Sequence, residues 1–308
     1  MQNKPFPILG TAMWGWTIPR EICFELLDNF YSRGFRQIDT ATNYPINKVA
    51  QDFRKAEKIL QEWINAHEIS DLEIIVKTGS LNNLGGSENN LTKSFLLLIL
   101  DEYEFLFHDN FHTFSVHWDN RDNPNEINST FEAFKIAADN GLKIGLSGIK
   151  YPEIYAGLNE TYGFNFRIQM KHNLLYSDYD RYSPLHEHGK FLAYGINAGG
   201  FKMKTEDYHA SSSLKVRGGN LGITKELAPT LLEIMNVVNN NATRERVTNF
   251  YQCALTYAWY QENMEGIILG TSKPEQLNQS MDFLEQLSSF DYSDLYEQLK
   301  KLANTINS

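Results

Sequence analysis

Hydrophobic residues recur along this chain with two different spacings. Short apolar runs rich in β-branched side chains alternate with longer segments in which apolar residues repeat every three or four positions, as Ile22, Leu26 and Phe30 do. The first spacing predicts buried strands and the second predicts amphipathic helices. The expected strands are residues 36–41, 72–78, 113–118, 143–147, 166–172, 190–197 and 266–270, with 290–292 as an eighth. The expected helices are residues 19–34, 48–66, 91–105, 127–140, 152–160, 224–239 and 244–261, a helix from Pro274 onward, and 293–307.

Strands that alternate with helices along a whole chain predict a parallel sheet. The short apolar strands suit burial on both faces, as in a (β/α)8 barrel or in an open, doubly wound sheet. No G-x-G-x-x-G motif follows the first strand, which weakens the dinucleotide-binding form of the open sheet. We therefore predict an α/β fold: one (β/α)8 TIM-barrel domain over residues 1–308, with extra C-terminal helices and a long loop after strand six.

Two stretches interrupt the alternation. Residues 7–16 mix Gly, Met and Trp before any regular spacing begins, and we expect them to form a hairpin that plugs the bottom of the barrel. Residues 198–221 are rich in Gly, Ser and Lys and are longer than an ordinary connection. We interpret this second stretch as a lid or clamp over a site.

Composition excludes several classes of protein. A formal net charge of −10 argues against nucleic acid or a polybasic membrane surface as partner. The longest apolar run, residues 95–100, is far shorter than the roughly 20 residues that span a bilayer, and the N-terminus lacks the apolar run of a signal peptide. Cys23 and Cys253 lie in helical apolar patterns, so we expect buried free thiols and no metal site. We predict a cytoplasmic protein, monomeric or a small homo-oligomer.

Polar side chains stand where the predicted strands end. Asp39 lies near the end of the first strand and Tyr44 in the loop after it, while Lys77, His117 and Ser147 end the next three strands. Polar groups that converge at the C-terminal ends of parallel strands are typical of a (β/α)8 active site. Taken singly, Asp39 and Lys77 also fit a buried ion pair, and His117 also fits a core histidine.

The segment DTATNY from Asp39 to Tyr44, with Lys77 and His117 on the next two strands, resembles the catalytic motifs of the aldo-keto reductases. The resemblance extends along nearly the whole chain, with Pro45 where the family usually has glycine. It implies an NAD(P)H-dependent oxidoreductase that interconverts a carbonyl (aldehyde, ketone or sugar) and an alcohol. Tyr44 would be the general acid and base, with its phenol pKa lowered from about 10 by Lys77. Asp39 would anchor Lys77, and His117 would orient the carbonyl oxygen.

The same resemblance implies residues for the nicotinamide end of a cofactor. Ser147 and Gln169 would hold the nicotinamide amide, and Tyr194 would stack on its ring. Gly148 stands where the family has a second amide-holding residue, asparagine. Backbone amides of Gly195 to Asn197, which replace the family's Ser-Pro-Leu, would meet the pyrophosphate.

At the phosphate end, residues 267–272 resemble the family's Ile-Pro-Gly segment, with Leu269 in place of proline. They precede the helix expected from Pro274, and a helix N-terminus favours anions. An ordinary capped helix would show the same residue types. The resemblance implies NADPH and leaves NADH open. The implied binding residues are Gly270, Thr271, Ser272, Lys273, Gln276 and Ser280, the last in place of an adenine-contacting asparagine.

Substrate contacts are expected from Trp14, Trp16, Trp118 and the loops at residues 82–88 and 201–217. The Asn, Ser and Lys content of these loops favours a polar, sugar-like small molecule as substrate. Two other functions stay open. One is a non-catalytic relative that senses NADPH as a regulatory subunit. The other is a barrel aldolase with Lys77 as Schiff base, which Asp39 disfavours because a carboxylate keeps the amine protonated.

Overall fold

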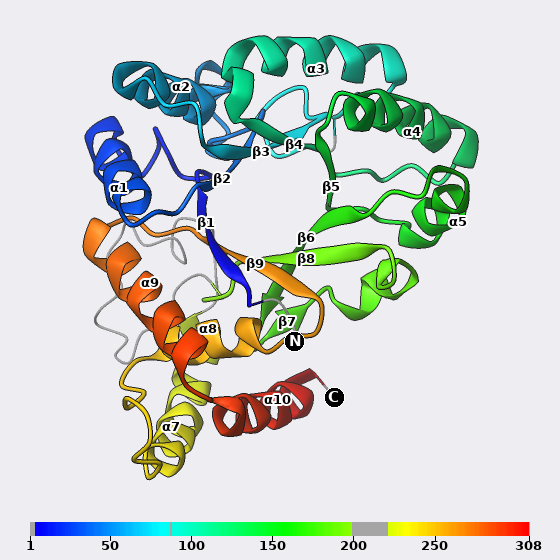
Figure 1. Ribbon diagram of the computed structural model, residues 1–308. Coiled ribbons are helices and arrows are strands. Elements are labelled where there is room, and N and C mark those ends of the chain that lie inside the picture. Colours follow the sequence, from blue (N-terminus) through cyan, green and yellow to red (C-terminus); the bar gives the residue numbers. More distant parts are fainter. Residues whose placement is uncertain (1–3, 87, 199–220, 308) are drawn as a thin grey trace.

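A computed structural model describes residues 4–86, 88–198 and 221–307 of the chain. Within these residues the sheet order is β5-β4-β3-β2-β1-β9-β8-β6-β7, and β5 also pairs with β6. The extra pairing closes a barrel of eight parallel strands (Figure 1), while the short β7 is antiparallel to β6. The strands are β1 (Phe6–Gly10), β2 (Gln37–Ala41), β3 (Glu73–Thr78), β4 (Phe111–His117), β5 (Lys143–Ser147), β6 (Phe166–Asn173), β7 (Tyr176–Ser177), β8 (Gly189–Tyr194) and β9 (Met264–Leu269).

The predicted barrel is confirmed, but two of its expected elements were wrong. Residues 6–10, which we expected within a plugging hairpin, form β1 and pair in parallel with both β2 and β9. Ile8 and Leu9 point to opposite faces of this strand and are both fully buried, so a strand of only five residues packs on both of its faces. Phe290 to Tyr292, expected as a strand, joins two helices. There the Tyr292 amide donates to the Tyr260 hydroxyl at 2.8 Å.

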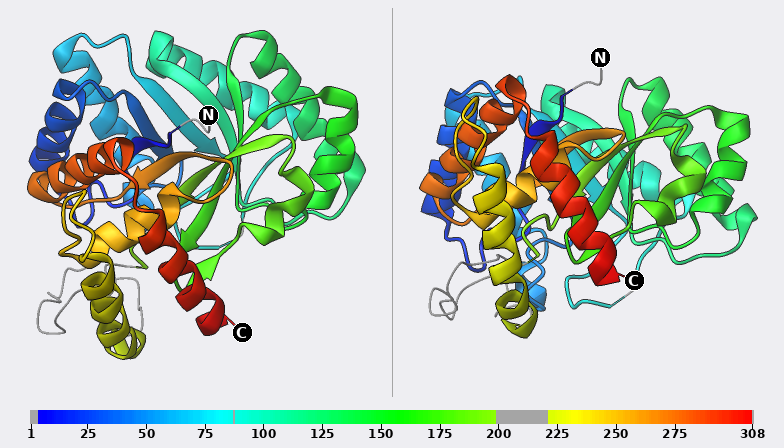
Figure 2. Two further views of the ribbon diagram at one scale, coloured as in Figure 1. Left: turned by 60° about the horizontal axis from the view of Figure 1, so that its bottom comes forward. Right: turned by 90° about the horizontal axis from the view of Figure 1, so that it is seen from below.

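Helices surround the barrel, and the views in Figure 2 show α7 and α10 projecting beyond this ring at one side. Helix α10 packs on α8 and α7. The helices are α1 (Arg20–Ser32), α2 (Lys55–His67), α3 (Lys93–Phe107), α4 (Pro124–Asp139), α5 (Pro152–Tyr162), α7 (Leu221–Val238), α8 (Phe250–Trp259), α9 (Pro274–Ser289) and α10 (Ser293–Asn307), with short 3-10 turns at Ala50–Asp52, His108–Asn110 and Asp180–Leu185.

Two helices begin later than the hydrophobic spacing predicts. The α8 helix starts at Phe250 rather than at residue 244, because Asn249 and Gln252 form a capping box there. Before it, Arg244 is held by Asp294 and by the carbonyl of Asp291, which fixes an irregular backbone. The α2 helix starts at Lys55 rather than at residue 48, after a residue in the left-handed region.

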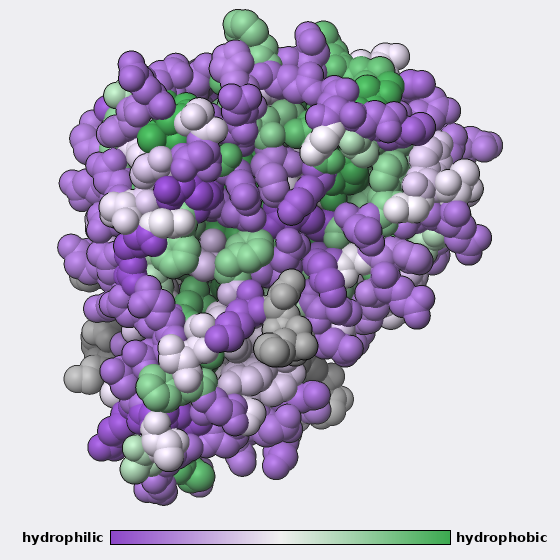
Figure 3. Space-filling model, viewed as in Figure 1, coloured by the Kyte–Doolittle hydropathy of each residue, from purple (hydrophilic) through white to green (hydrophobic). Residues whose placement is uncertain are grey.

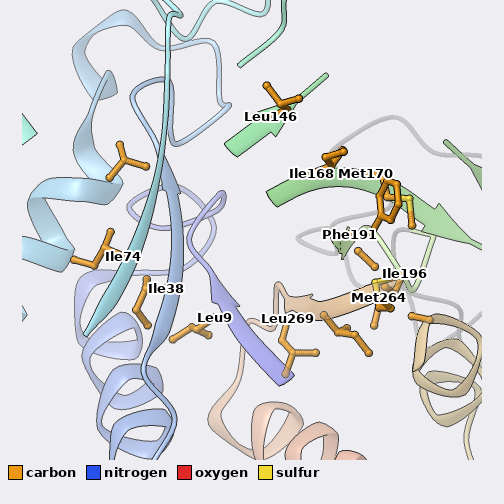
Figure 4. Packing of buried hydrophobic residues seen from close by; sticks show 14 of the residues in the cluster. Leu9, Ile38, Ile74, Leu146, Ile168, Met170, Phe191, Ile196, Met264 and Leu269 are labelled. Carbon is orange, nitrogen blue, oxygen red and sulfur yellow. The ribbon is translucent and has the colours of Figure 1, made fainter. Parts of the chain in front are cut away.

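The main hydrophobic core lies between the strands and the surrounding helices. Figure 4 shows side chains such as Leu9, Ile38, Ile74 and Leu146 on the outer faces of their strands. Each such side chain contributes about 1.5–3 kcal/mol when fully buried. A second, smaller cluster consists of Ile8, Ile75, Leu192 and Ile268 inside the barrel, with Phe6 and Tyr194 packed against it.

A polar cluster lies near the N-terminal ends of the strands. Arg167, 3% exposed, donates to the Gln37 side chain at 2.6 Å and to the Thr113 hydroxyl at 3.0 Å, and pairs with Glu265 at 3.3 Å. We call Arg167, Gln37, Thr113 and Glu265 the lower cluster. Its members come from the N-terminal halves of β2, β4, β6 and β9, at the end of the barrel where the sequence predicted a hairpin.

The face shown in Figure 3 is mostly hydrophilic, with apolar side chains visible in small areas between charged ones. In the described part of the chain, no helix is both long and apolar enough to cross a membrane. Cys23 and Cys253 are buried and unpaired, as the sequence predicts. Burial raises the pKa of each thiol to about 12.

His172 on β6 makes stability depend on pH. Its ring stacks on Tyr257 at 4.7 Å, and burial lowers its pKa to about 4. In the unfolded chain the pKa of a histidine is about 6.5, so the unfolded chain takes up this proton first as the pH falls. Stability is therefore lost as the pH falls below that value. Through His172 the protein should lose about 2 kcal/mol of its unfolding free energy between pH 7.5 and 5. His172→Phe should abolish this part of the loss. Urea unfolding at the two pH values measures this.

The matched control is His108→Gln, at an exposed histidine. It should leave the loss of stability between the two pH values as it is in the unchanged protein. An equal effect of both substitutions would contradict the assignment to His172.

Candidate active site

A buried ion pair lies at the centre of the site. Asp39 on β2 and Lys77 on β3 are 3% and 1% exposed, and the Lys77 Nζ donates to Asp39 Oδ2 at 2.5 Å and also to Oδ1. Gln169 on β6 reaches across the barrel and donates its amide to Asp39 Oδ1 at 2.5 Å. These bonds to both charges are needed because a buried charge without a partner destabilises the fold by several kcal/mol.

Tyr44 stands directly over the Lys77 ammonium. The Lys77 Nζ lies 4.9 Å from the centroid of the Tyr44 ring. Burial acts to lower the pKa of Lys77, but the Asp39 carboxylate and the charge and hydrogen bond of Tyr44 outweigh it, so the pKa is raised. The lysine is therefore a cation that contacts both a carboxylate and a phenol.

His117 ends β4 beside this group. Its ring meets the Tyr44 ring edge-on, with the centroids 6.4 Å apart. Burial, and secondarily the Lys77 charge, hold the pKa of His117 well below its usual value, so the imidazole is neutral at physiological pH. Its Nδ1 is buried and has no partner among the described residues.

Strand register brings the predicted nicotinamide residues beside the catalytic candidates. His117 pairs with Ser147, and Ser147 pairs with Gln169, so the three lie in one row across β4, β5 and β6. Tyr194 ends β8 and packs against the apolar cluster inside the barrel. Gly195 follows with φ +65, a left-handed conformation that suits glycine, and Asn197 is half-buried beyond it.

Gly148 and Trp118 fit against one another. Gly148 has φ +68, and a Cβ there would lie 2.5 Å from the Trp118 ring. Trp118 itself has φ +63, and its ring lies 4.2 Å from that of His117. The indole therefore occupies the space that a side chain at position 148 would need, so glycine is the residue that fits there.

Of the residues predicted for the phosphate end, Gly270 to Lys273 lie directly ahead of α9, and Gln276 and Ser280 lie within it. Thr271 Oγ1 is buried without a partner among the described residues, and Lys273 stands exposed at the helix N-terminus. Gly270 and Ser272 are exposed, and Gln276 is half-buried. An unsatisfied hydroxyl and a lysine at a helix N-terminus form a fitting cradle for phosphate. Ser280 differs, since it is buried and donates to the Gln276 carbonyl of its own helix at 2.8 Å.

The tryptophans predicted to contact the substrate differ in how deeply they are buried. Trp118 is half-buried beside His117, and Trp16 is half-buried against the core. Trp14 is fully buried, so its contact with a substrate stays a prediction. The predicted lid at residues 198–221 and the loop at 201–217 fall almost wholly outside the described residues.

Sequence reasoning missed Asn83 and Asn89. Asn83 lies in the loop at residues 82–88 that we expected to face the substrate, and Asn89 directly follows that loop. The amides of both bind neighbouring loops of the protein itself. The only signal in the sequence was the concentration of Asn between residues 82 and 90, which is equally typical of an ordinary loop.

This fold and this cluster define a (β/α)8 barrel with a lysine–carboxylate–phenol group at the C-terminal ends of its strands. The sequence profile of the Aldo/keto reductase family matches residues 8–300, and the chain belongs to this family. Members of the family are typically NADP(H)-dependent carbonyl reductases.

Comparisons with individual proteins add detail. The fold is similar to that of aldo-keto reductase AKR11C1 from Bacillus halodurans (holo form), with a TM-score of 0.70 and 16% identity over 96% of this chain and 90% of that one. An uncharacterized 11.2 kDa protein in the crtE 3′ region of Pseudescherichia vulneris is 35% identical over 60 residues. That match spans 20% of this chain and 58% of the relative's length.

The contact between Gly148 and Trp118 predicts a strong coupling between the two positions. Gly148→Ala should destabilise the protein by about 2–4 kcal/mol, through the left-handed backbone and the overlap with the indole. In a Trp118→Ala background the same change should cost only about 1–2 kcal/mol, because the backbone term alone remains. Chemical denaturation of the four proteins gives the coupling energy. Additive effects would contradict the contact.

Proposed function

We propose that this protein is an NAD(P)H-dependent oxidoreductase that interconverts a small carbonyl compound and its alcohol, with Tyr44 as general acid and base. The observation that carries the proposal is the buried Lys77 ammonium, which contacts both the Asp39 carboxylate and Tyr44. In this role the lysine needs no contact with the substrate, and its charge acts through the phenol.

Lys77 and Tyr44 act on each other's protonation. Tyr44 raises the pKa of Lys77, so by linkage the Lys77 charge favours the ionised form of the Tyr44 phenol to the same extent. In carbonyl reduction Tyr44 donates its hydroxyl proton to the carbonyl oxygen, and in alcohol oxidation the phenolate removes that proton. Asp39 keeps Lys77 charged and in place.

His117 contributes orientation rather than charge. A neutral imidazole offers one N–H to the carbonyl oxygen and adds no second cation beside Lys77. The low pKa of His117 and its position edge-on to Tyr44 support this role. The carbonyl oxygen would then accept hydrogen bonds from the phenol and from the imidazole together.

The residues for a nicotinamide cofactor fit the group that the family binds. Ser147, Gln169 and Tyr194 would hold the nicotinamide end, and Thr271 and Lys273 the phosphate end. The unpartnered Thr271 hydroxyl supports a phosphate there. When bound, the nicotinamide supplies or takes the hydride.

The observed geometry weakens a Schiff-base aldolase function. A Schiff base requires a neutral lysine amine, whereas Lys77 has a raised pKa and two contacts with Asp39. A regulatory role without turnover is separated from catalysis by the experiment below.

Replacing Tyr44 with phenylalanine tests the proposed function. The variant keeps the ring over Lys77 but loses the transferable proton, so kcat for carbonyl reduction should fall about 10²–10⁴-fold. NADPH binding, measured by tryptophan fluorescence, should stay within a factor of about three of the original. A panel of aldehydes, ketones and sugars provides the substrates. Unchanged turnover would refute the role of Tyr44, and NADPH binding without any turnover in the original protein would favour the regulatory alternative.

Lys273 should contribute to binding of the cofactor phosphates. Lys273→Met removes a cation at the α9 N-terminus, so the Kd for NADPH should rise about 5- to 30-fold at low salt and by less at high salt. Lys135→Met, on the exposed surface of α4, is the control and should leave the Kd unchanged. Equal affinities of the Lys273 and Lys135 variants would exclude this contribution.

A further inference from the structure

The loop that follows Lys77 is folded on itself. Ser80 and Asn89 form an antiparallel bridge, the Leu81 amide donates to the Glu88 carbonyl at 3.1 Å, and the Asn90 amide donates to the Gly79 carbonyl at 2.8 Å. These bonds tie both sides of the loop together next to the end of β3. The two sides of the loop are therefore joined at its base, and a different asparagine bonds to each neighbouring loop.

Asn83 connects this loop to the Tyr44 loop. It is 2% exposed, and its Nδ2 lies 3.2 Å from the Pro45 carbonyl, 3.1 Å from Asn47 Oδ1 and 2.8 Å from the Val49 carbonyl. Three oxygens around one nitrogen fix the orientation of the amide, because only the NH2 group can face acceptors alone. The backbone directly after Tyr44 is thus anchored by the loop that follows β3.

Asn89 connects the other side of the same loop to the segment after His117. Its Nδ2 donates to the Trp118 carbonyl. Trp118 has φ +63, which a bulky residue adopts only when its surroundings enforce it, and its amide also donates to the Ser147 carbonyl at 2.8 Å. Asn89 therefore holds the carbonyl side of a strained residue that follows His117.

We propose that Asn83 and Asn89 are positioning residues that fix Tyr44 and His117 relative to each other through the loop after Lys77. This inference rests on the proposed function of Tyr44 and His117. Tyr44 lies in the loop after β2 and His117 at the end of β4, and their rings meet edge-on with centroids 6.4 Å apart. Because both must reach one carbonyl oxygen, a shift of either loop by about 1 Å would cost about 10²-fold in rate.

The test compares isosteric substitutions. Asn83→Asp keeps the shape of the side chain but replaces the NH2 group with an oxygen that faces three acceptor oxygens. Asn89→Asp likewise places an oxygen against the Trp118 carbonyl. Asn65→Asp is the control, because it adds the same charge at an exposed position near the C-terminal end of α2, outside both loops. We expect kcat to fall about 10- to 100-fold in Asn83→Asp and Asn89→Asp, while their Kd for NADPH stays within about three-fold of the original. In the control, kcat should change by less than about three-fold.

The pH profile separates positioning from general destabilisation. If Asn83→Asp lets Tyr44 move away from Lys77, the phenol loses the effect of that charge. The alkaline limb of kcat/KM for reduction should then shift to higher pH. Asn83→Ala, which removes the donor without adding repulsion, should shift it less. A lower melting temperature with unchanged kcat and an unchanged alkaline limb would overturn the proposal.

A spectroscopic measurement keeps this test separate from that of the proposed function. In protein labelled with 13Cζ-tyrosine, the signal missing from Tyr44→Phe belongs to Tyr44, and its titration requires no turnover. Asn83→Asp should move that titration to higher pH, and Asn65→Asp should not. If Tyr44→Phe leaves turnover intact, the proposed function fails. If the Tyr44 titration is the same in all variants, the positioning role fails.

Discussion

The ion pair between Asp39 and Lys77 is the constraint on which the arrangement of the site depends. Two opposite charges, both nearly inaccessible to solvent, cost several kcal/mol each to desolvate, and pairing them seldom improves on apolar residues of the same size. Such a pair is therefore poorly explained by stability alone. Its position at the C-terminal ends of β2 and β3, next to a phenol, is explained by chemistry at that end of the barrel.

The sheet and the loops position different parts of this site. Strand register alone sets His117, Ser147 and Gln169 in one row, because neighbouring parallel strands place paired residues side by side. Tyr44 lies beyond the end of β2 and cannot be placed by register. Its position depends on the ammonium beneath it and on the loop that follows, which is why hydrogen bonds between loops matter more for the phenol than for the imidazole.

Periodic features of the sequence predicted most of the fold. Apolar runs gave seven of the eight barrel strands, and their order implied that Asp39, Lys77 and His117 converge. The strand β1 was missed because Pro5, Pro7 and Gly10 obscure a run of five residues that only tertiary pairing stabilises.

Contacts between distant residues account for the other errors and omissions. The spacing of hydrophobic residues predicted a helix upstream of Phe250, where Arg244 is instead bound to Asp294 of α10. The fit of Trp118 against Gly148 and the bonds of Asn83 to the Tyr44 loop likewise join segments about 30 to 40 residues apart. Neither composition nor periodicity contains such information, so the sequence indicated which candidate residues converge but not the contacts that support them.

The interior of the barrel also has a consequence for engineering. Four aliphatic residues, Ile8, Ile75, Leu192 and Ile268, separate the lower cluster around Arg167 from the charges around Lys77. Hydrocarbon excludes water and screens charges poorly, and the Asp39 carboxylate acts on the pKa of Arg167 across this layer. Evolution or design therefore cannot change the charges at one end of this barrel without regard to the other.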